Sequence, residues 1–396
     1  MHTSRRWPVP RWVPGGRAAR RRHPDVSLVA AGDELGFTPV EPPVWLRWLP
    51  FGYVAFVLLL EATLQEEWAV SFFLIALPPI VACAYGPAVV AALTVAAILL
   101  EGFLAAQADH LWENHHVTAD MATALVGILS TVLAASRVRQ TRSLVHANSV
   151  AEALMRTLLR PVPHQVGQVL AASLYRPSEV GTMVGGDLFD IRVTDCGERA
   201  IIGDVRGKGL QAVRAVAAIL GSFREAAYEA GDLPTVAARL ERRLVREARE
   251  IPDEELFATA LLMEYDSLTG RVTFTNHGHV EPVLISRGEV SALAGPPVLP
   301  LGLGGLAVPA EGPVAWSHRF ARGDVLLLVT DGLAEARDHD GAFYPLVDRL
   351  RQRFAGRPAP GPAEVVDFLN CDLPRFARGL HDDVAILAIA PHCGSG

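Results

Sequence analysis

Residues 201–213 read IIGDVRGKGLQAV, in which an apolar run is followed by an aspartate, closely spaced glycines and the start of a helical pattern. The run Ala200–Gly203 predicts a buried strand, and the glycines after Asp204 predict a tight turn. The apolar spacing beyond them predicts a helix over Leu210–Ala230. An aspartate between a buried strand and a glycine turn has its carboxylate held at the end of a sheet. The stretch therefore indicates an α/β element and a candidate site residue together.

Three more motifs place acids near glycine at predicted strand ends: VGGDLFD at 184–190, LLLVTDG at 326–332 and HDDVAIL at 381–387. Carboxylates that converge on one cleft repel each other, which raises their pKa values unless cations neutralise them. Ligands that are all oxygen select hard ions such as Mg²⁺ or Mn²⁺ over zinc. A single Asp-Gly is usually a turn residue, but four such motifs in one domain favour a metal site. The acids concerned are Asp187, Asp190, Asp204, Asp331, Asp382 and Asp383.

The pattern over residues 164–391 is that of one α+β domain. A second helix is predicted over Leu233–Arg249. Strands at both ends with helices between them favour a mixed, mostly antiparallel sandwich over a doubly wound parallel sheet. Neither GxGxxG after a strand nor GxxxxGK[ST] occurs, so the nucleotide-binding folds have no support. Besides Ala200–Gly203, strands are predicted at Val169–Tyr175, Ala258–Tyr265, Arg271–Thr275, Pro282–Ile285, Val325–Val329 and Val384–Ala390.

The N-terminal part of the chain has a different composition. Of the 396 residues, 50% are hydrophobic and 20% charged, and the mean hydropathy is +0.25, which disfavours both disorder and a wholly soluble protein. Residues 44–136 are predicted to be an all-α transmembrane region of four helices. Proline at 87 makes the middle connection a tight hairpin. The four apolar runs are Val44–Leu60, Ala69–Tyr85, Pro87–Ala106 and Met121–Ala135.

Flanking charges predict the orientation of these helices. Seven arginines precede the first acid within a basic, disordered segment, residues 1–43, and Arg137, Arg139 and Arg142 follow the last apolar run. Arginines remain on the cytoplasmic side, so both termini and the α+β domain are expected in the cytoplasm. A cleaved signal peptide is the alternative. The opposite connections carry the acids Glu61, Glu66, Glu67, Asp109, Glu113 and Asp120.

Two features of the membrane region leave alternatives open. Glu101 lies inside the third run, where a carboxylate either has a functional partner or, the favoured interpretation, reaches water near the outer face. The sequence HLWENHH offers His110, Glu113, His115 and His116 as a conceivable metal or pH sensor, but a solvated loop is the favoured interpretation.

Residues 137–163 are predicted to form a linker helix that ends before Pro161 and Pro163. Its apolar residues fall at coiled-coil spacing, which is compatible with a homodimer or with packing on the chain's own domain. Residues 392–396 form a tail. The cysteines are too far apart for a zinc ribbon or a disulfide scaffold, which indicates a reducing compartment. The acidic total charge of −7 disfavours nucleic-acid binding. The linker residues are Leu144, Ala147, Ala151, Leu154 and Leu158, and the cysteines Cys83, Cys196, Cys371 and Cys393.

Residues 158–391 resemble the metal-dependent protein serine/threonine phosphatases of type 2C, in the bacterial branch typified by the stage II sporulation E phosphatase. The resemblance rests on LYRPSEVGTMVGGDLFD, GDVRGKGLQAV, FATALLMEYD, FTNHGHVEPVLI, PLGL, LLLVTDGLAEA and HDDVAIL, in this order. It implies a β-sandwich flanked by helices with a two-metal centre at one end. By motif, Asp187, Asp204, Asp331 and Asp382 would be metal ligands, with Asp204 and the Val205 carbonyl bridging. Asp383 would support the ligands.

The resemblance also implies the reaction. Two Mn²⁺ or Mg²⁺ ions would activate a water molecule for in-line attack on a phosphoserine or phosphothreonine. The substrate would be a regulatory protein such as an anti-sigma-factor antagonist, and the enzyme would lie in a bacterial plasma membrane. The chain has no GxSxG elbow, which suits a reaction without a protein nucleophile.

The sequence departs from the family pattern at Arg206 and Lys208, where a small residue and a histidine are frequent. Lys208, the only lysine in the chain, could bind substrate phosphate or pair with a neighbouring acid. His277 replaces a small residue, whereas Asn276 and His279 match, and these two are interpreted as residues that fix a turn. A catalytically silent membrane scaffold and a small transporter are the competing functions. Retention of the metal acids argues against the first, and the lack of an inverted repeat against the second.

Overall fold

The computed structural model describes residues 43–63, 70–107, 114–178, 184–250, 255–296, 298–306, 315–357, 359–377 and 379–392. Several predictions fall outside these ranges: the basic N-terminal segment up to residue 42, nearly all of the C-terminal tail with Cys393, and the acids Glu66, Glu67, Asp109 and Glu113. The side chains of Glu61, His110, His115 and His116 are also outside the described part of the chain.

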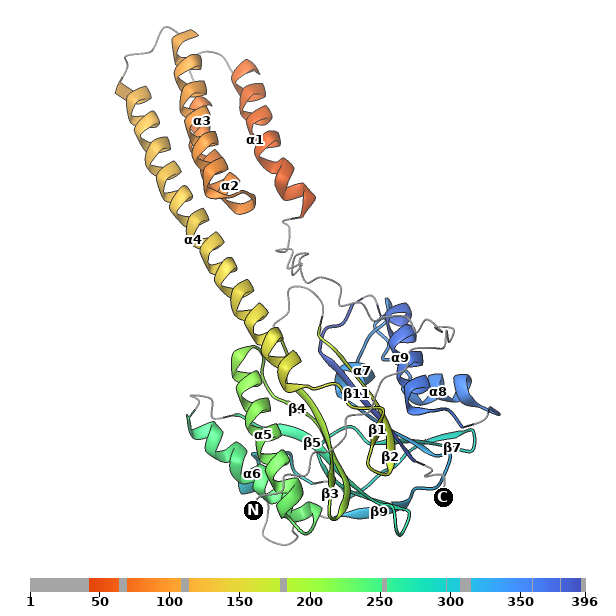
Figure 1. Ribbon diagram of the computed structural model, residues 1–396. Helices are drawn as coiled ribbons and strands as arrows, with labels where there is room; N and C mark the ends of the chain where they lie inside the picture. Colours follow the sequence, from red (N-terminus) through yellow and green to blue (C-terminus); the bar gives the residue numbers. More distant parts are fainter. Residues whose placement is uncertain are drawn as a thin grey trace, which may run out of the picture. The chain divides into compact units, whose positions relative to one another are not determined.

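All four apolar runs form helices (Figure 1). The second begins with a 3₁₀ turn before it becomes α-helical, and only Tyr85 and Gly86 separate it from the third, as the predicted hairpin requires. Pro87 is the first residue of that third helix, where its missing N–H has no partner to lose. The elements are α1 Val44–Thr63, η1 Val70–Ala76, α2 Leu77–Ala84, α3 Pro87–Gln107 and α4 Asn114–Leu158.

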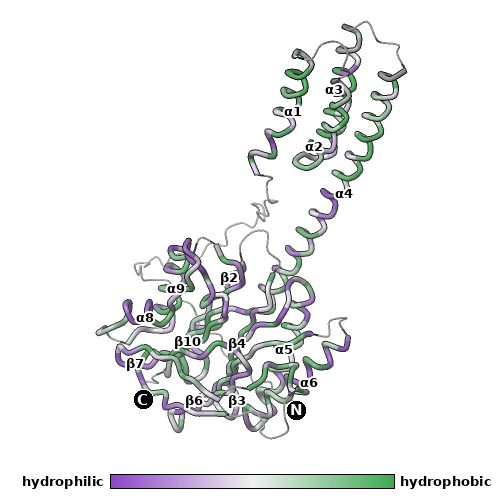
Figure 2. Tube along the Cα trace, turned by 180° about the vertical axis from the view of Figure 1, so that it is seen from behind, coloured by the Kyte–Doolittle hydropathy of each residue, from purple (hydrophilic) through white to green (hydrophobic). Residues whose placement is uncertain are grey.

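By length and composition, one helix among the described residues is able to cross a membrane, the segment Val117–Leu158 of α4. The apolar stretches of the other helices are shorter: Val44–Leu60, Phe73–Ala84 and Pro87–Phe103. The linker predicted from residue 137 is no separate helix, because α4 continues through that position for 45 residues in all. In Figure 2 the hydrophobic colour of α4 gives way to hydrophilic colour part-way along the helix.

The structure contradicts the expectation that Glu101 reaches water. It is 4% exposed on α3, and the Thr123 hydroxyl of α4 donates a hydrogen bond of 3.1 Å to its Oε1. At the other end of the bundle, Arg137 donates to the carbonyl oxygens of Cys83 (2.5 Å) and Tyr85 (3.0 Å), which α2 leaves without helical partners. Polar groups thus join α4 to α3 and to the end of α2.

Two antiparallel sheets form the centre of the remaining described chain. Their order is β1-β2-β11-β10-β7-β8 in the first and β3-β4-β5-β6-β9 in the second. All the described pairings are antiparallel, so the predicted α+β sandwich is confirmed. The strands are β1 Gln165–Val166, β2 Val169–Arg176, β3 Asp187–Thr194, β4 Gly197–Val205, β5 Ala258–Asp266, β6 Arg271–His277, β7 Val283–Ser286, β8 Glu289–Ala292, β9 Trp316–Arg319, β10 Val325–Val329 and β11 Val384–Pro391.

The sandwich has four layers. Helices α5 Leu210–Glu229 and α6 Leu233–Glu250 cover the second sheet, and α8 Leu346–Phe354 and α9 Pro362–Phe376 cover the first. Strand β10 shows how the first sheet serves two cores: Leu326 and Leu328 face the second sheet, whereas Val325, Leu327 and Val329 face α8 and α9. This alternation explains why the strand is apolar throughout. The sequence patterns predicted α5 and α6 but not α8 and α9.

The end of α4 is part of the body that the two sheets form. Ala151, Met155 and Leu159 lie fully or almost fully buried in the core shared by α5 and the two sheets. The Asn148 side chain accepts a hydrogen bond of 2.8 Å from the Val184 N–H. The proposed coiled-coil stripe is therefore divided, because Ala151 packs on the chain's own domain while Leu144 and Leu154 remain 65% and 45% exposed.

Candidate functional site

The first two of the four predicted metal ligands, Asp187 and Asp204, lie directly opposite each other on neighbouring strands. Asp187 is the first residue of β3, and it pairs in register with Asp204 near the end of β4. Because side chains of directly opposed residues lie on the same face of a sheet, both carboxylates point to one side. Asp187 is 2% exposed, whereas Asp204 is partly exposed.

The third acid comes from the other sheet. Asp331 follows β10 and begins the short helix α7 Asp331–Ala334. One carboxylate oxygen from each of Asp187, Asp204 and Asp331 lies within 4.8 Å of the others. Three of the four predicted metal acids are thus brought together at one end of the sandwich, across the gap between the sheets.

Thr330 connects the two sheets at this point. Its hydroxyl donates a hydrogen bond of 2.7 Å to Asp187 Oδ2 and accepts one of 2.8 Å from the Ala385 N–H of β11. The residue is fully buried. Sequence reasoning did not identify Thr330, because a threonine at the end of an apolar strand is also a common strand residue.

Two glycines make the close approach of these segments possible. A Cβ on Gly186 would lie 2.2 Å from the Val205 carbonyl oxygen, and one on Gly332 would lie 1.9 Å from the Asp383 carbonyl oxygen. Neither distance can accommodate a side chain, and the obstructing atoms are backbone. The Val205 carbonyl, predicted to be a ligand, therefore lies beside the segment that carries Asp187.

The carboxylates strongly perturb one another. Burial, followed by repulsion from Asp204, raises the pKa of Asp187 well above its ordinary value, while the Thr330 hydrogen bond opposes this shift. Burial and repulsion from Asp331 and Asp382 raise the pKa of Asp204 to about 8. The pKa of Asp331 is also raised, first by burial and then by Asp382. Such a site is unfavourable when all its acids are ionised, unless cations are bound.

The fourth predicted ligand, Asp382, stands just before β11 and outside the three-carboxylate cluster. Its Oδ1 lies 3.2 Å from the Nζ of Lys208, and both side chains are about half exposed. Of the two roles considered for Lys208, pairing with a neighbouring acid is therefore the one seen here. The ion pair holds the turn after β4 against the start of β11.

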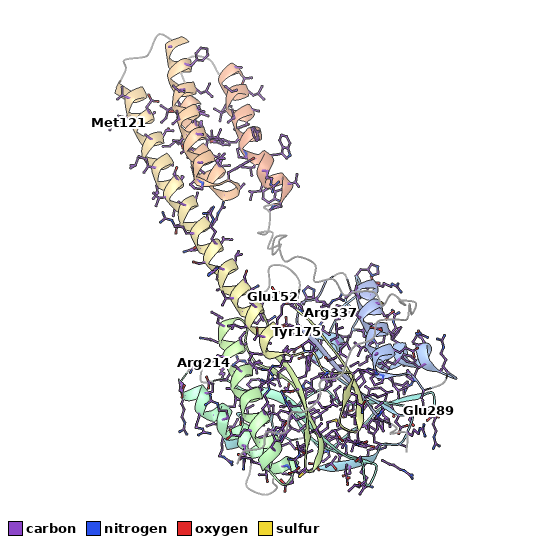
Figure 3. All side chains as sticks on the ribbon, viewed as in Figure 1. Met121, Glu152, Tyr175, Arg214, Glu289 and Arg337 are labelled. Carbon is purple, nitrogen blue, oxygen red and sulfur yellow. The ribbon has the colours of Figure 1, made fainter. Side chains whose placement is uncertain are left out.

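Asp383 is buried, and both of its carboxylate oxygens accept hydrogen bonds. Its carboxylate accepts hydrogen bonds from the Tyr175 hydroxyl (2.5 Å), the Ser178 N–H (2.9 Å) and the Gly185 N–H (3.0 Å). Burial and the negative charge of Asp383 raise the pKa of Tyr175, so the phenol stays a donor. Figure 3 labels Tyr175 at the end of the sandwich where α4 carries Glu152. Asp383 therefore positions the glycine segment before Asp187, as expected for a supporting residue.

Two other residues of the acidic motifs have structural partners. Asp190 lies on β3 and forms ion pairs with Arg192 (2.8 Å) and Arg224 (2.6 Å). Arg224 also donates to the Leu158 carbonyl at the end of α4. Arg206 forms an ion pair with Glu255, and its guanidinium lies 5.7 Å from the centre of the Phe257 ring.

The Asn276–His279 segment is a turn. The Asn276 side chain accepts from the His279 N–H (2.7 Å) and donates to the His279 carbonyl (2.9 Å), while His279 Nδ1 lies 3.0 Å from the Thr259 hydroxyl. Burial lowers the pKa of His279 to about 4, so its ring is neutral at physiological pH. His277 is buried against the Leu299 carbonyl. These contacts agree with a turn-fixing role.

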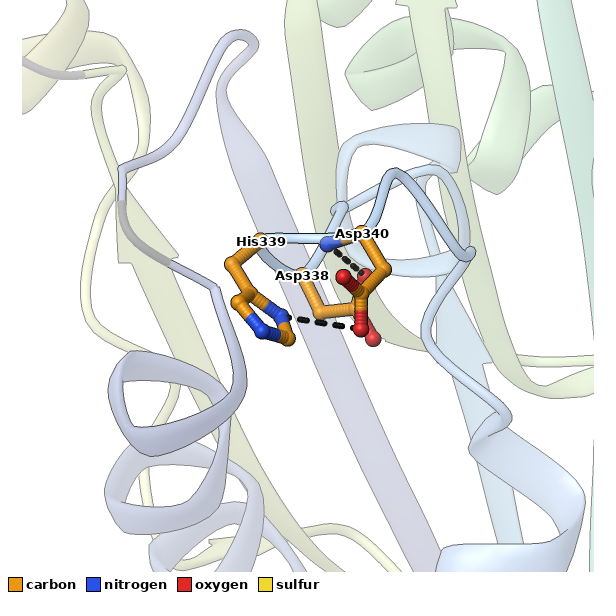
Figure 4. Close-up of side chains that lie close together, drawn as sticks. All are labelled: Asp338, His339 and Asp340. Carbon is orange, nitrogen blue, oxygen red and sulfur yellow. Dashed lines mark hydrogen bonds and ion pairs between the residues drawn. The ribbon is translucent and has the colours of Figure 1, made fainter.

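A second acidic group, Asp338, His339 and Asp340, is exposed on a surface turn (Figure 4). Asp338 Oδ1 accepts from the backbone N–H groups of Asp340 and Ala342, both at 2.9 Å. This is the hydrogen bonding of an ordinary aspartate turn. Asp340 Oδ2 lies 3.1 Å from His339 Nδ1, so both carboxylates have structural partners without a metal.

The first cluster, by contrast, suits hard divalent cations. Its donors are all carboxylate oxygens, and Asp187 is almost completely buried. The Val205 carbonyl lies beside Gly186, the residue before Asp187. Lys208 is the cation whose charge reduces the pKa shift of Asp204, and this lysine is already paired with Asp382. The remaining negative charge is compatible with Mg²⁺ or Mn²⁺.

An antiparallel sandwich covered by helices, with a buried carboxylate cluster suited to divalent cations, is the architecture of the metal-dependent serine/threonine protein phosphatases. The sequence profile of the family described as Stage II sporulation protein E (SpoIIE) matches residues 195–392, half of the chain. The chain belongs to this family. The matched range includes Asp204, Asp331 and Asp382, and Asp187 precedes it by eight residues.

Solved structures with partial similarity come from several bacteria. The RsbU and RsbW domains of a Mycobacterium tuberculosis protein are 22% identical over 60% of this chain and 64% of that one, with a TM-score of 0.49. The SiaA-PP2C domain of Pseudomonas aeruginosa is 20% identical over 65% and 98%, with a TM-score of 0.49. The PP2C domain of Bacillus subtilis SpoIIE with a fragment of its regulatory domain is 19% identical over 57% and 64%, with a TM-score of 0.47. The match thus spans less than two thirds of the first and third of these chains.

Replacing Thr330 by valine is expected to destabilise the catalytic domain by about 2 kcal/mol, because the buried Ala385 N–H loses its acceptor and Asp187 its donor. Activity at limiting Mn²⁺ is expected to fall as well, since Asp187 becomes harder to ionise. Urea unfolding and metal titration of a fragment from residue 140 to 392 measure both effects. Thr330→Ser keeps the hydroxyl and is the control. Equal stability of the valine variant and the wild type would contradict this role for Thr330.

Proposed function

We propose that the chain is a membrane-anchored phosphatase that hydrolyses phosphoserine or phosphothreonine on a regulatory protein. The observation that carries the proposal is the convergence of Asp187, Asp204 and Asp331 within 4.8 Å, from two sheets of a domain that matches the SpoIIE family. A catalytically silent scaffold is disfavoured, because a site that binds no metal gains nothing from three mutually repelling acids.

In this proposal each residue near the cluster has a definite task. Asp187, Asp204 and Asp331 would hold the cations, together with the Val205 carbonyl and with Asp382 if it separated from Lys208. Thr330 and Asp383 fix the positions of Asp187 and of the segment before it. Lys208, released from Asp382, would be free to contact the phosphate. Two Mn²⁺ or Mg²⁺ ions would supply an activated water molecule and neutralise the phosphoryl oxygens.

Exposed apolar side chains support membrane anchoring. Outward-facing residues of α1, α3 and α4 include large hydrophobic groups that a water-facing bundle would hide. They include Trp48 (67% exposed), Phe56 (57%), Leu99 (69%), Leu125 (69%) and Leu133 (60%). Tryptophans at 45 and 48, at the start of α1, suit a membrane interface. We propose four membrane-associated helices, with both termini and the catalytic domain in the cytoplasm of a bacterial cell.

The family match supports a phosphorylated protein substrate, and an anti-sigma-factor antagonist is the specific candidate. A homodimer through the exposed part of α4, at Leu144 and Leu154, is compatible with the exposure of those side chains.

The experiment that tests the proposed activity is release of phosphate from a model phosphate ester by the fragment from residue 140 to 392. Hydrolysis is expected with Mn²⁺ and is expected to disappear with a chelator. Full activity in the chelator would contradict a metal-dependent reaction, and no hydrolysis of esters or of phosphoproteins under any metal condition would favour the silent scaffold.

The orientation has its own test. A reporter that is active only outside the cytoplasm is expected to be silent when fused after Arg142 and active when inserted beside Asn114, because arginines remain on the cytoplasmic side. A cytoplasmically active reporter at the same two positions provides the reciprocal control. The opposite pattern would place the catalytic domain outside the cytoplasm and remove the proposed substrate.

A further inference from the structure

A cavity of about 700 Å³ lies between α4 and the first residue of α5, just beyond the apolar part of α4. This cavity is open to solvent. Its polar lining comes from Arg139, Arg142, Ser143 and His146, and its apolar lining comes from Ala147 and Val150 of α4 and Leu210 of α5. The four polar residues stand at i, i+3, i+4 and i+7, so they share one face of the helix.

The arginines after the apolar segment have different roles. Arg137 is occupied, because it donates to the Cys83 and Tyr85 carbonyls of the bundle. Arg139 and Arg142 are exposed, and within the described residues neither has an ion pair or a hydrogen bond. Arg156, further along the same helix, pairs with Glu152 at 2.6 Å. Two neighbouring guanidinium groups on one face are thus left for an anion from elsewhere.

The position of these arginines points to the source of the anion. The apolar run ends at Ala135, and a helix rises about 1.5 Å per residue, so Arg139 and Arg142 lie about 6 and 10 Å beyond it. The headgroup layer of a bilayer is roughly 5–8 Å thick on each side. Both guanidinium groups therefore lie within side-chain reach of the phosphate groups of the cytoplasmic leaflet, which is rich in anionic lipid.

We propose that this cavity binds the phosphate of an anionic phospholipid headgroup, with Arg139 and Arg142 as its ligands and Ser143 and His146 as additional hydrogen-bond donors. Arginine suits this task because its planar donor pairs bind phosphate oxygens bidentately. The inference rests on the proposed membrane anchoring and adds a specific lipid site to it.

The proposed lipid site adjoins the two segments that form hydrogen bonds with Val184, which lies three residues before Asp187. Asn148, half a turn beyond His146, accepts from the Val184 N–H, and the Gly209 N–H beside Leu210 donates to the Val184 carbonyl at 2.6 Å. A headgroup bound between α4 and α5 therefore contacts the two elements that fix Val184.

The test uses the full chain in lipid nanodiscs of phosphatidylcholine with a minor fraction of phosphatidylglycerol. Native mass spectrometry counts the phosphatidylglycerol molecules that the protein retains. Each basic residue near an anionic surface contributes about a five-fold gain in binding, so R139Q/R142Q is expected to bind phosphatidylglycerol about 30-fold more weakly. R139K/R142K keeps the charge and is expected to retain most of the lipid, and R156Q is the matched control that leaves retention unchanged.

Equal retention by R139Q/R142Q and R156Q would overturn the proposal. Displacement of the lipid by excess inorganic phosphate would also overturn it, since the cavity would then be a site for a free anion. Extraction of the wild-type chain from cell membranes by alkaline carbonate would contradict the membrane anchoring and the lipid site together. A chain that resists extraction but shows no preference for phosphatidylglycerol would contradict the lipid site alone.

Discussion

Replacing Asp204 by asparagine is expected to lower turnover at saturating Mn²⁺ by about 10³-fold or more while the domain stays folded, because electrostatic stabilisation of the reacting phosphoryl group depends on correctly held cations. Asp204 lies opposite Asp187 and belongs to the three-carboxylate cluster, so the substitution would remove one of the proposed metal ligands. Hydrolysis of a phosphate ester measures the effect, and circular dichroism of the same sample measures folding.

Two results would contradict this interpretation, one by excluding a central role for Asp204 and the other by pointing to altered packing. Activity within ten-fold of wild type in excess Mn²⁺ would contradict the central role of Asp204. A similar loss in Asp190→Asn, whose carboxylate lies outside the cluster and pairs with Arg192 and Arg224, would indicate that the loss comes from altered packing. Mn²⁺ titration distinguishes weaker metal binding from an inactive bound state.

The same substitution has a consequence for stability without metal. Because the pKa of Asp204 is raised to about 8 in the folded protein and is near 3.8 when unfolded, the folded state binds the extra proton between these values. The metal-free domain is therefore expected to lose stability as pH rises from about 4 to 8, and the raised pKa of Asp187 adds to this trend. Asp204→Asn is expected to flatten the slope. Thermal unfolding in a chelator across this pH range provides the measurement.

The sequence predicted the acids of the site because their pattern is local. An aspartate beside a glycine at the end of a buried strand lies at the end of a sheet where the strands terminate, and Asp204 near the end of β4 and Asp331 just after β10 do so for that reason. The two-sheet arrangement that brings these residues together also follows from strands at both ends of the domain. The local sequence pattern therefore predicted which residues are acids of the site and where each one lies relative to its strand.

Contacts between segments that are far apart in the sequence could not be predicted from local patterns. Thr330 reaches Asp187 across 143 positions, and Tyr175 reaches Asp383 across 208, so neither partner is implied by its own surroundings in the sequence. Asp382 and Asp383 are adjacent and chemically identical, so their own residue pattern does not separate them, and their different roles were expected only from the family resemblance. Asp383 points into a buried set of donors, whereas Asp382 points to Lys208 at the surface.

The extent of α4 was the other feature hidden from the sequence. Composition changes sharply after Ala135, which favoured a boundary between a span and a linker, yet the backbone continues as one helix to Leu158. Helix propensity does not change where hydropathy does, because arginine, glutamine and alanine are all good helix formers. A single rigid element therefore leads from the apolar bundle to the core of the catalytic domain.

This continuity predicts that the rotational phase of α4 affects catalysis. Inserting one alanine after Ser149 turns the preceding helix by about 100° relative to Ala151 and moves Asn148 away from Val184. Val184 leads directly into the glycines before Asp187, and misplacement of a catalytic group by 1 Å can cost about 100-fold in rate. The single insertion is expected to reduce phosphatase activity of the membrane-embedded chain by about ten-fold or more, measured with a phosphate ester in nanodiscs.

A seven-residue insertion is the matched control. Duplicating residues 143–149, SLVHANS, nearly restores the direction of the helix and places an asparagine where Asn148 now stands. Its activity is expected to stay within about two-fold of wild type, since a few tenths of a kcal/mol correspond to less than a factor of two. Asn148→Ala isolates the hydrogen bond to Val184 from the rotation. If the one-residue and seven-residue insertions have the same activity, α4 is a tether whose phase is irrelevant. If the alanine substitution alone reproduces the single insertion, the effect arises from this one contact, because the membrane helices then keep their orientation.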